Sequence, residues 1–378
     1  MRTALVNGRV LTDTGLQSGL TVVIEGERIV EVTASRVHAE RTHDLQGRVL
    51  APGFIDCQVN GGGGVLFNDD PTVDGVRRIA QAHRRFGTTG MLPTLISDDA
   101  AIMRRAIDAV AQARAQRVPG VLGIHLEGPF LSVPKRGIHD AAKFRAPDAA
   151  DIVLIANGGA GSTLMTIAPE EVSPDVVREL TGHGVIVAAG HTSATYERTR
   201  AALDAGLRGF THLYNAMSPL QSREPGAVGA ALDDATSWCG IIVDGYHVHA
   251  AALRVALHAK PRGKVFLVTD AMPPVGADDP TFSLNGETIT CRDGKCTNDS
   301  GTLAGSALDM AAAVRNTVAT LGVDLAETLR MASQYPAAFI GLESTHGRIA
   351  AGYAADLVVL EDGFVVETWC AGQHERAF

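Results

Sequence analysis

The sequence predicts an α/β protein: a (β/α)8 TIM-like barrel at residues 51–343, with a small β-sandwich formed by the N- and C-terminal segments, 1–50 and 344–378. Three observations support this prediction. Eight short apolar runs alternate with helix-like segments through the middle of the chain. Four of these runs end in a residue that can bind a metal or move a proton, and barrel strands carry their chemistry at that end. Both ends of the chain alternate strands with glycine turns.

Composition fits such a chain and excludes several classes of function. At 378 residues, the protein can bury one large core and a small second domain. The net charge of −9 argues against a nucleic-acid surface. No apolar run approaches the roughly 18 residues of a membrane span, and the N-terminus shows no hydrophobic run of signal-peptide length. We therefore expect a cytoplasmic enzyme with neither nucleic acid nor membrane as a partner.

The cysteines indicate a reducing compartment. There are five, an odd number at scattered positions. Cys291 and Cys296 flank Arg-Asp-Gly-Lys and would face each other across a hairpin. In a cytoplasmic chain we expect these two to remain thiols rather than form a disulfide.

The elements follow in order along the chain. Up to about residue 50, alternating apolar residues and glycine turns predict strands. The expected barrel strands are 50–57, 88–96, 121–127, 163–168, 185–191, 208–213, 239–244 and 264–270. Helix-like segments between them are 72–86, 99–117, 173–183, 194–205 and 248–259.

After the eighth strand the alternation stops. Residues 282–297 predict a β-hairpin insertion that turns at Asp293-Gly294. Helix-like segments at 305–321 and 324–341 follow it. Residues 347–372 return to strands, which we expect to pair with the strands at the N-terminus.

The strand-end residues point to a metal. The strand at 121–127 ends in Glu127, and a buried carboxylate is costly unless a cation lies beside it. His191 and His212 end two later strands. One carboxylate and two imidazoles with an open coordination position are typical of a catalytic metal. Hydrogen bonds within the barrel mouth would explain one such residue better than they explain three.

Several motifs together resemble a known family. The runs Pro52-Gly-Phe-Ile-Asp56 and 347–356 resemble the amidohydrolase superfamily. Within it, the chain resembles the N-acetylglucosamine-6-phosphate deacetylases from near residue 1 to near residue 372. The motifs that carry this resemblance are His125-Leu-Glu-Gly-Pro-Phe130, Lys135-Arg-Gly-Ile-His139, Ala189-Gly-His-Thr192, Thr211-His-Leu-Tyr-Asn-Ala-Met217, Arg223-Glu-Pro-Gly226, Asp244-Gly-Tyr-His247 and Val268-Thr-Asp-Ala271.

The resemblance implies a reaction and a cofactor. The reaction is hydrolysis of N-acetyl-D-glucosamine 6-phosphate to D-glucosamine 6-phosphate and acetate, in amino-sugar recycling. The metal is held by Glu127, His191 and His212. Zn²⁺ is the expected ion, and Fe²⁺ or Co²⁺ would fit the same ligands. The first strand ends in Gln58-Val-Asn60, and carboxamides bind transition metals poorly, so we expect one ion per subunit.

Two further residues, Asp270 and His139, have expected catalytic roles. Asp270, at the end of the eighth strand, is the expected general base, which takes a proton from water and hands it to the departing amine. Its alternative role is a structural cap of the next helix. By resemblance, His139 stabilises the oxyanion.

The resemblance also implies a shared site. In the family that the chain resembles, the arginine that matches Arg223 contacts the substrate phosphate in the site of the neighbouring subunit. The resemblance therefore implies a homodimer. The residues that we place at the substrate are Gln58, Asn60, Ile138, Asn215, Ala216, Arg223, His247, Leu303, Ala304 and Gly305.

Three alternatives stay open at this point. The substrate could be N-acetylgalactosamine 6-phosphate, because the sequence does not distinguish two sugars that differ in the configuration of a single hydroxyl. A second alternative is another amidohydrolase that acts on N-acyl or cyclic amides, which the motifs at 211–217 and 223–226 disfavour. A third is a non-catalytic sugar-phosphate sensor, which the retention of Asp270 beside three metal ligands disfavours.

Overall fold

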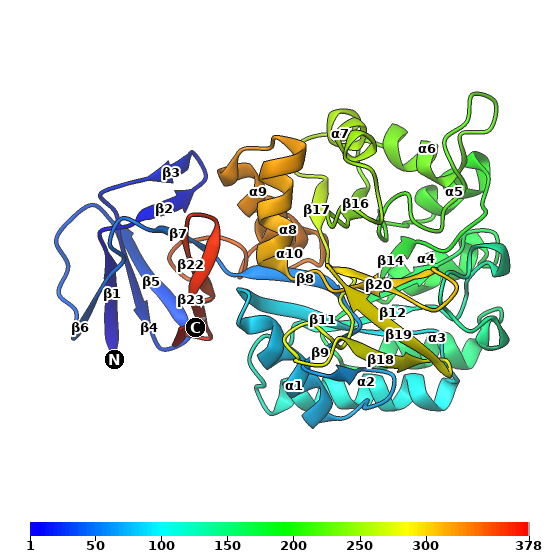
Figure 1. Cartoon of the computed structure of the whole chain (residues 1–378), viewed down its shortest axis with the longest axis horizontal. Helices are drawn as coiled ribbons and strands as arrows, with labels where there is room; N and C mark the ends of the chain where they lie inside the picture. Colours follow the sequence, from blue (N-terminus) through cyan, green and yellow to red (C-terminus); the bar gives the residue numbers. More distant parts are fainter. Residues whose placement is uncertain (377–378) are drawn as a thin grey trace.

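A computed structural model describes residues 1–376 of the protein, so the last two residues of the predicted segment 344–378 lie outside the described part. Figure 1 shows a β-rich lobe that carries both chain ends and a larger α/β lobe beside it. Within residues 1–376, no helix combines the length and the apolar character that crossing a bilayer requires.

The large lobe is built on a parallel eight-stranded sheet, and this confirms the predicted barrel. A hydrogen bond from Asp270 N to Gln58 O (3.0 Å) and a parallel bridge between Val59 and Ala271 close the barrel between its last and first strands. The strands are β8 Phe54–Val59, β11 Thr88–Ile96, β12 Gly123–Glu127, β13 Ser162–Ile167, β14 Ile186–Ala189, β15 Gly209–Phe210, β16 Trp238–Ile241 and β17 Val265–Leu267.

Helices cover the barrel, and several of them begin at side-chain caps. The hydroxyls of Thr72, Ser173 and Thr195 each accept a hydrogen bond from a backbone N–H of the first turn, which satisfies a donor that the helix leaves free. The helices are α1 Val73–Arg84, α2 Ala100–Ala115, α3 Ala149–Asn157, α4 Pro174–Gly182, α5 Tyr196–Asp204, α6 Gly226–Asp233, α7 Ala250–Ala259, α8 Met310–Asn316, α9 Leu325–Ala332 and α10 Gln334–Phe339. All the predicted helical segments are present, and the structure adds α3 and α6.

The backbones of β12 and β13 leave little room for a side chain at the start of β12. Gly123 lies against the neighbouring strand so closely that a Cβ atom would overlap the carbonyl oxygen of Ser162. We therefore expect Gly123→Ala to destabilise the fold by about 1–3 kcal/mol, because strand and side chain must shift apart. Thermal unfolding measures this change. Gly182→Ala, at the end of α4 where a Cβ meets open space, is the control and should leave the melting temperature unchanged or slightly raised.

The β-rich lobe joins the two ends of the chain. One sheet has the order β5-β4-β1-β6 and the other β24-β23-β22-β7-β2-β3. The strands are β1 Arg2–Val6, β2 Arg9–Thr12, β3 Gly15–Gln17, β4 Thr21–Glu25, β5 Arg28–Thr33, β6 Arg41–Asp44, β7 Val49–Pro52, β22 Leu357–Glu361, β23 Phe364–Cys370 and β24 Gln373–Arg376. Leu50 pairs with Val359 across β7 and β22, so the predicted pairing of the two ends is confirmed.

The insertion after β17 is larger than the predicted hairpin. It forms an antiparallel sheet of β18 Thr281–Leu284, β19 Glu287–Arg292, β20 Lys295–Thr297 and β21 Leu303–Ser306. The turn at Asp293-Gly294 is confirmed, since both residues have positive φ. Because residues 303–306 form β21, the next helix begins only at Met310.

Our expectation for the cysteines in this insertion is wrong. Cys291 and Cys296 lie directly opposite each other on β19 and β20, with their Cα atoms 4.0 Å apart, and they form a disulfide. The other three, Cys57, Cys239 and Cys370, are buried free thiols. The tight two-residue turn places the pair in register, which outweighs the expectation drawn from compartment alone.

Candidate active site and metal centre

A cavity of about 520 Å³ opens at the carboxyl ends of the barrel strands, between the barrel and the insertion. Barrel-strand ends supply its polar floor, and β21 supplies part of its wall. The residues that line it include Asn60, Glu127, Lys135, Ile138, His139, His191, His212, Asn215, Ala216, His247, Asp270, Thr302, Leu303 and Gly305. A larger cavity of about 640 Å³ lies at the amino end of β12 and against the β-rich lobe, on the opposite side of the barrel.

Three ligand atoms converge at the floor of the smaller cavity. The Oε1 atom of Glu127 lies 2.9 Å from Nε2 of His212 and 3.3 Å from Nε2 of His191. The two Nε2 atoms are 3.1 Å apart. Nδ1 of His191 donates to the carbonyl oxygen of Lys135 (2.8 Å), which leaves the lone pair on Nε2 for a metal. This donor set fits a divalent transition ion with an open position.

The charges in this cluster support each other. Burial opposes ionisation of Glu127, but its contacts with His191 and His212 outweigh burial and hold the pKa of this carboxyl well below its usual value. Burial likewise opposes protonation of His212, yet its hydrogen bond to Glu127 leaves the pKa of this imidazole raised. The cluster therefore keeps a carboxylate ready for a cation.

The backbone at three of these strand ends adopts an uncommon conformation. His191, His212 and Asp270 have φ values of 46°, 34° and 55°, in the left-handed region that non-glycine residues avoid. Such residues cost about 1–3 kcal/mol each and persist where the surroundings enforce them, often in active sites. Here the left-handed turn ends each strand at the residue that lines the cavity.

Asp270 is held by the two amides of the first strand. Its Oδ1 atom accepts hydrogen bonds from Asn60 Nδ2 (2.7 Å) and Gln58 Nε2 (3.1 Å). Gln58 also donates to both carboxylate oxygens of Glu127, each at 3.2 Å. Burial and the nearby charge of Glu127 raise the pKa of Asp270. The structure thus places Gln58 and Asn60 as donors that orient two carboxylates.

His139 presents a fixed hydrogen-bond donor. The backbone N–H of Ser97 donates to its Nδ1 (3.3 Å), so the ring proton must reside on Nε2. That Nε2 lies 4.0 Å from Glu127 Oε2. Burial and the neighbouring His191 lower the pKa of His139 to about 3, which keeps the ring neutral. Sequence reasoning missed Ser97, although it directly follows the second barrel strand.

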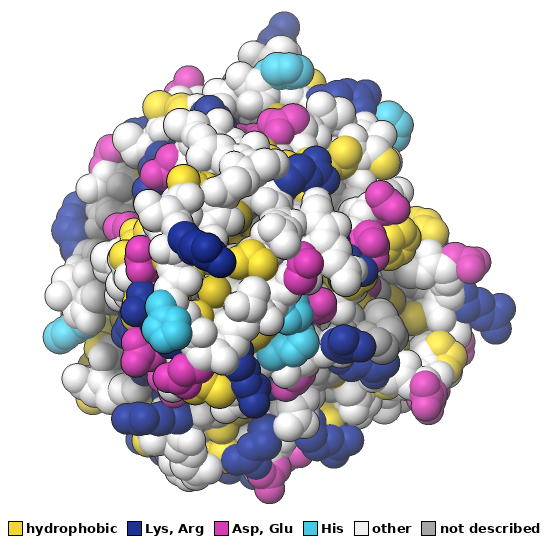
Figure 2. Space-filling view, turned by 90° about the vertical axis from the view of Figure 1, so that its left-hand side faces the viewer, with side chains coloured by type: hydrophobic (Ala, Val, Ile, Leu, Met, Phe, Trp, Pro, Cys, Tyr) yellow, Lys and Arg dark blue, Asp and Glu magenta, His cyan; other side chains and the backbone are white. Residues whose placement is uncertain are grey.

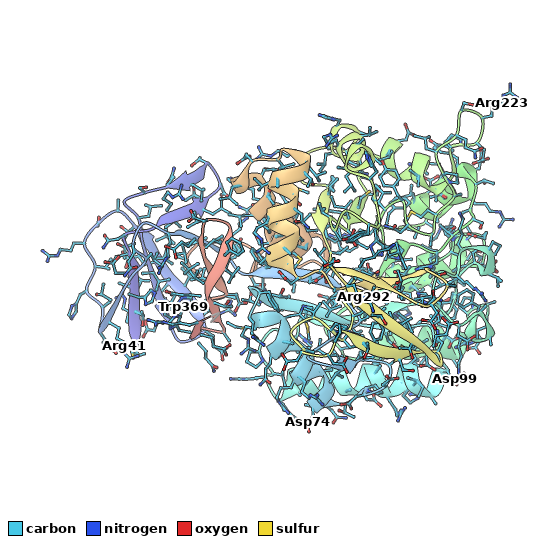
Figure 3. The ribbon with its side chains drawn as sticks, viewed as in Figure 1. Arg41, Asp74, Asp99, Arg223, Arg292 and Trp369 are labelled. Atoms are coloured by element: carbon cyan, nitrogen blue, oxygen red, sulfur yellow. A yellow bond between two sulfur atoms is a disulfide. The ribbon has the colours of Figure 1, made fainter. Side chains whose placement is uncertain are left out.

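The remaining predicted residues divide into three groups. His247, whose Nδ1 donates to Asp244 (2.6 Å), lines the cavity with Ile138, Asn215, Ala216, Leu303 and Gly305. Ala304 is buried within β21 between two of these residues. Arg223 is exposed at the tip of a loop (Figure 3), and it is not among the residues that line the cavity. Lys135 and Thr302 also line the cavity; Lys135 begins the motif that ends at His139, and Thr302 directly precedes Leu303.

A buried cluster of one carboxylate and two imidazoles at the carboxyl face of a (β/α)8 barrel defines a metal-dependent hydrolase. Residues 49–374 match the model of the amidohydrolase family. The chain is 44% identical to the N-acetylgalactosamine-6-phosphate deacetylase of Shewanella sp. (strain ANA-3), over 97% of this chain and 94% of that protein. It is 35% identical to the N-acetylglucosamine-6-phosphate deacetylase of Haemophilus influenzae, over 97% of both chains.

A solved structure agrees with these relatives. The N-acetylglucosamine-6-phosphate deacetylase from Pasteurella multocida superposes with a TM-score of 0.96 at 36% identity, and each chain is covered completely. The chain belongs to the amidohydrolase family, in the branch of the N-acetylhexosamine-6-phosphate deacetylases, which confirms the resemblance seen in its motifs.

Proposed function

We propose that this protein hydrolyses the N-acetyl group of N-acetyl-D-glucosamine 6-phosphate, giving D-glucosamine 6-phosphate and acetate in the cytoplasm. The observation that carries the proposal is the meeting of Glu127, His191, His212, Asp270 and His139 in one cavity of about 520 Å³. The galacto epimer is the second candidate substrate, because a relative at 44% identity is named for it.

The residues divide the chemistry between them. A divalent ion held by Glu127, His191 and His212 supplies Lewis acidity toward water and the acetyl carbonyl. We propose one ion per subunit, Zn²⁺ first and Fe²⁺ or Co²⁺ as alternatives.

The chain itself moves the proton and holds the oxyanion. Asp270 takes a proton from the attacking water and passes it to the amine as the C–N bond breaks. His139 donates a hydrogen bond from Nε2 to the acyl oxygen, where negative charge develops.

Substrate panels test this proposal. Acetate release is measured with N-acetylglucosamine 6-phosphate, its galacto epimer, unphosphorylated N-acetylglucosamine and an N-acetyl amino acid. We expect efficient turnover of one or both sugar phosphates and far slower release from the other two. Preference for the N-acetyl amino acid would refute the proposal, and the ratio between the epimers identifies the preferred substrate.

Replacement of His139 tests the proposed oxyanion contact. We expect His139→Gln to lower kcat about 10²–10³-fold with little change in KM, because the contact strengthens only in the transition state. Steady-state kinetics and metal analysis of the same sample check this. His258→Gln, at an exposed position of α7, is the control. A change confined to KM would place His139 in ground-state binding instead.

We also propose that two subunits share their sites through Arg223. The support is its position: this side chain is exposed at a loop tip (Figure 3) and does not line the cavity of its own chain. An arginine fork suits a phosphate, so its removal should chiefly raise KM.

Mixing two variants, each of which has little activity at a substrate concentration far below the KM of Arg223→Ala, tests the exchange. Arg223→Ala and Asp270→Asn, mixed and allowed to exchange subunits, should regain activity, since one site of each mixed dimer then has both residues intact. Neither variant mixed with itself recovers. If the mixture stays inactive after subunit exchange is verified, Arg223 does not act across subunits.

A further inference from the structure

The β-sandwich carries a second cluster of metal-binding side chains. His43 on β6, Glu367 on β23 and His374 on β24 offer ligand atoms that all lie within 4.8 Å of one another. Nε2 of His43 lies 2.6 Å, and Nε2 of His374 3.1 Å, from the same Oε2 atom of Glu367. Figure 2 views this lobe end-on and shows histidines exposed next to acidic side chains. The cluster belongs to a different lobe from the catalytic cavity (Figure 1).

The strand register explains why these residues meet. Trp369 on β23 lies directly opposite His374 on β24. Glu367 precedes Trp369 by two residues and therefore points to the same face of the sheet. β6 is an edge strand of the other sheet, so His43 approaches the cluster from across the sandwich. The three ligands thus come from both sheets.

Neighbouring side chains orient the ligands. Nη1 of Arg48 lies 3.8 Å from Oε1 of Glu367, so the arginine faces one carboxylate oxygen and the histidines face the other. The Trp369 ring packs against both imidazoles, with centroids 4.6 Å from His374 and 5.5 Å from His43. Glu367 is buried, while His374 is exposed and leaves one side of the cluster open to water.

From this geometry we propose that His43, Glu367 and His374 bind one transition-metal ion of the zinc class, with solvent completing its coordination. Two imidazole nitrogens and one carboxylate oxygen are the ligands that such ions prefer, and Mg²⁺ or Ca²⁺ would prefer oxygen alone. The donors of a tetrahedral site lie roughly 3.3 Å apart for bonds of about 2.0–2.1 Å. The distances of 2.6 Å and 3.1 Å from the two Nε2 atoms to Glu367 Oε2 are close to this spacing, and entry of an ion requires His43 to move outward.

The bound ion would have a structural role. It connects β24, a short exposed strand near the end of the described chain, to β6 in the opposite sheet. Binding to the folded state alone stabilises it by mass action. In the absence of an ion, the same histidines donate hydrogen bonds to Glu367, and the cluster is then only a polar contact.

Tryptophan fluorescence separates these two outcomes without reference to activity. The chain has two tryptophans, so Trp238→Phe leaves Trp369 as the only one. The holoenzyme of this variant is titrated with Cu²⁺ or Co²⁺, which quench a nearby indole. We expect saturable quenching at one ion per chain, which excess Zn²⁺ reverses by competition.

Matched variants assign the quenching to the cluster. Glu367→Gln and His374→Ala should each abolish the saturable phase, and His374→Ala keeps the test valid if Glu367→Gln disturbs the sandwich. His38→Ala, an exposed histidine in the same lobe, should leave it intact. Quenching that is absent from the start, or that survives both cluster variants, overturns the proposal. Dependence on the catalytic residue His191 would assign the ion to the other lobe and overturn it equally.

Discussion

Replacement of Asp270 by asparagine should abolish almost all turnover while the metal stays bound. Asparagine keeps the size of the side chain and an oxygen that can still accept hydrogen bonds from Asn60 and Gln58. It cannot take a proton from water, and general base catalysis contributes about 10²–10⁴-fold. We expect kcat to fall by at least that factor. Acetate release and elemental analysis, on the same preparation, measure both parts of the prediction.

The pH dependence provides the internal check on this variant. The base must be deprotonated to act, so kcat/KM of the wild type should fall as the pH drops below the pKa of Asp270. In Asp270→Asn, the pH profile of the residual kcat/KM should no longer show this decrease at acidic pH. Unchanged activity would mean that Asp270 has only its alternative role as a helix cap. Loss of metal from the variant would instead make it part of the metal site.

Metal removal has the other large expected effect. Dialysis against a chelator should reduce activity to background, and one equivalent of Zn²⁺ per chain should restore it. Without a cation, Glu127 remains a buried carboxylate among imidazoles, and the acetyl carbonyl has no Lewis acid. Addition of the ion should also raise the melting temperature, because the ion binds the folded state.

The amide side chains at the end of the first barrel strand provide a control for the number of ions that the barrel binds. In the wild type, Gln58 and Asn60 use their amide nitrogens to hold Glu127 and Asp270, so we expect one catalytic ion. Gln58→His with Asn60→His should raise the number of ions bound at the barrel, since imidazole is a far better ligand than a carboxamide. Two ions at the wild-type barrel would show that the amides bind metal after all. His191→Ala should lose both ion and activity.

The barrel was predictable because its signals are local. Each strand is a short apolar run, and residues such as Glu127 and His212 stand out at the strand ends without knowledge of the fold. The disulfide was missed because the compartment argument ignored the register that the Asp293-Gly294 turn imposes. Ser97 was missed because its role depends on a contact with His139, far along the chain. Arg223 does not line the cavity of its own chain, and its contact with a neighbouring subunit stays a prediction.

The pairing of N-terminal with C-terminal strands in the β-rich lobe has a consequence for biosynthesis. β7 emerges early from the ribosome, yet one of its two edges is completed only by β22, which is made after the entire barrel. Until then, that edge of β7 has unpaired backbone groups and can recruit strands from other chains. Pairing over so great a sequence separation is also slow. Nascent chains that stall or terminate before β22 would therefore display this edge, which makes them targets for chaperones and proteases.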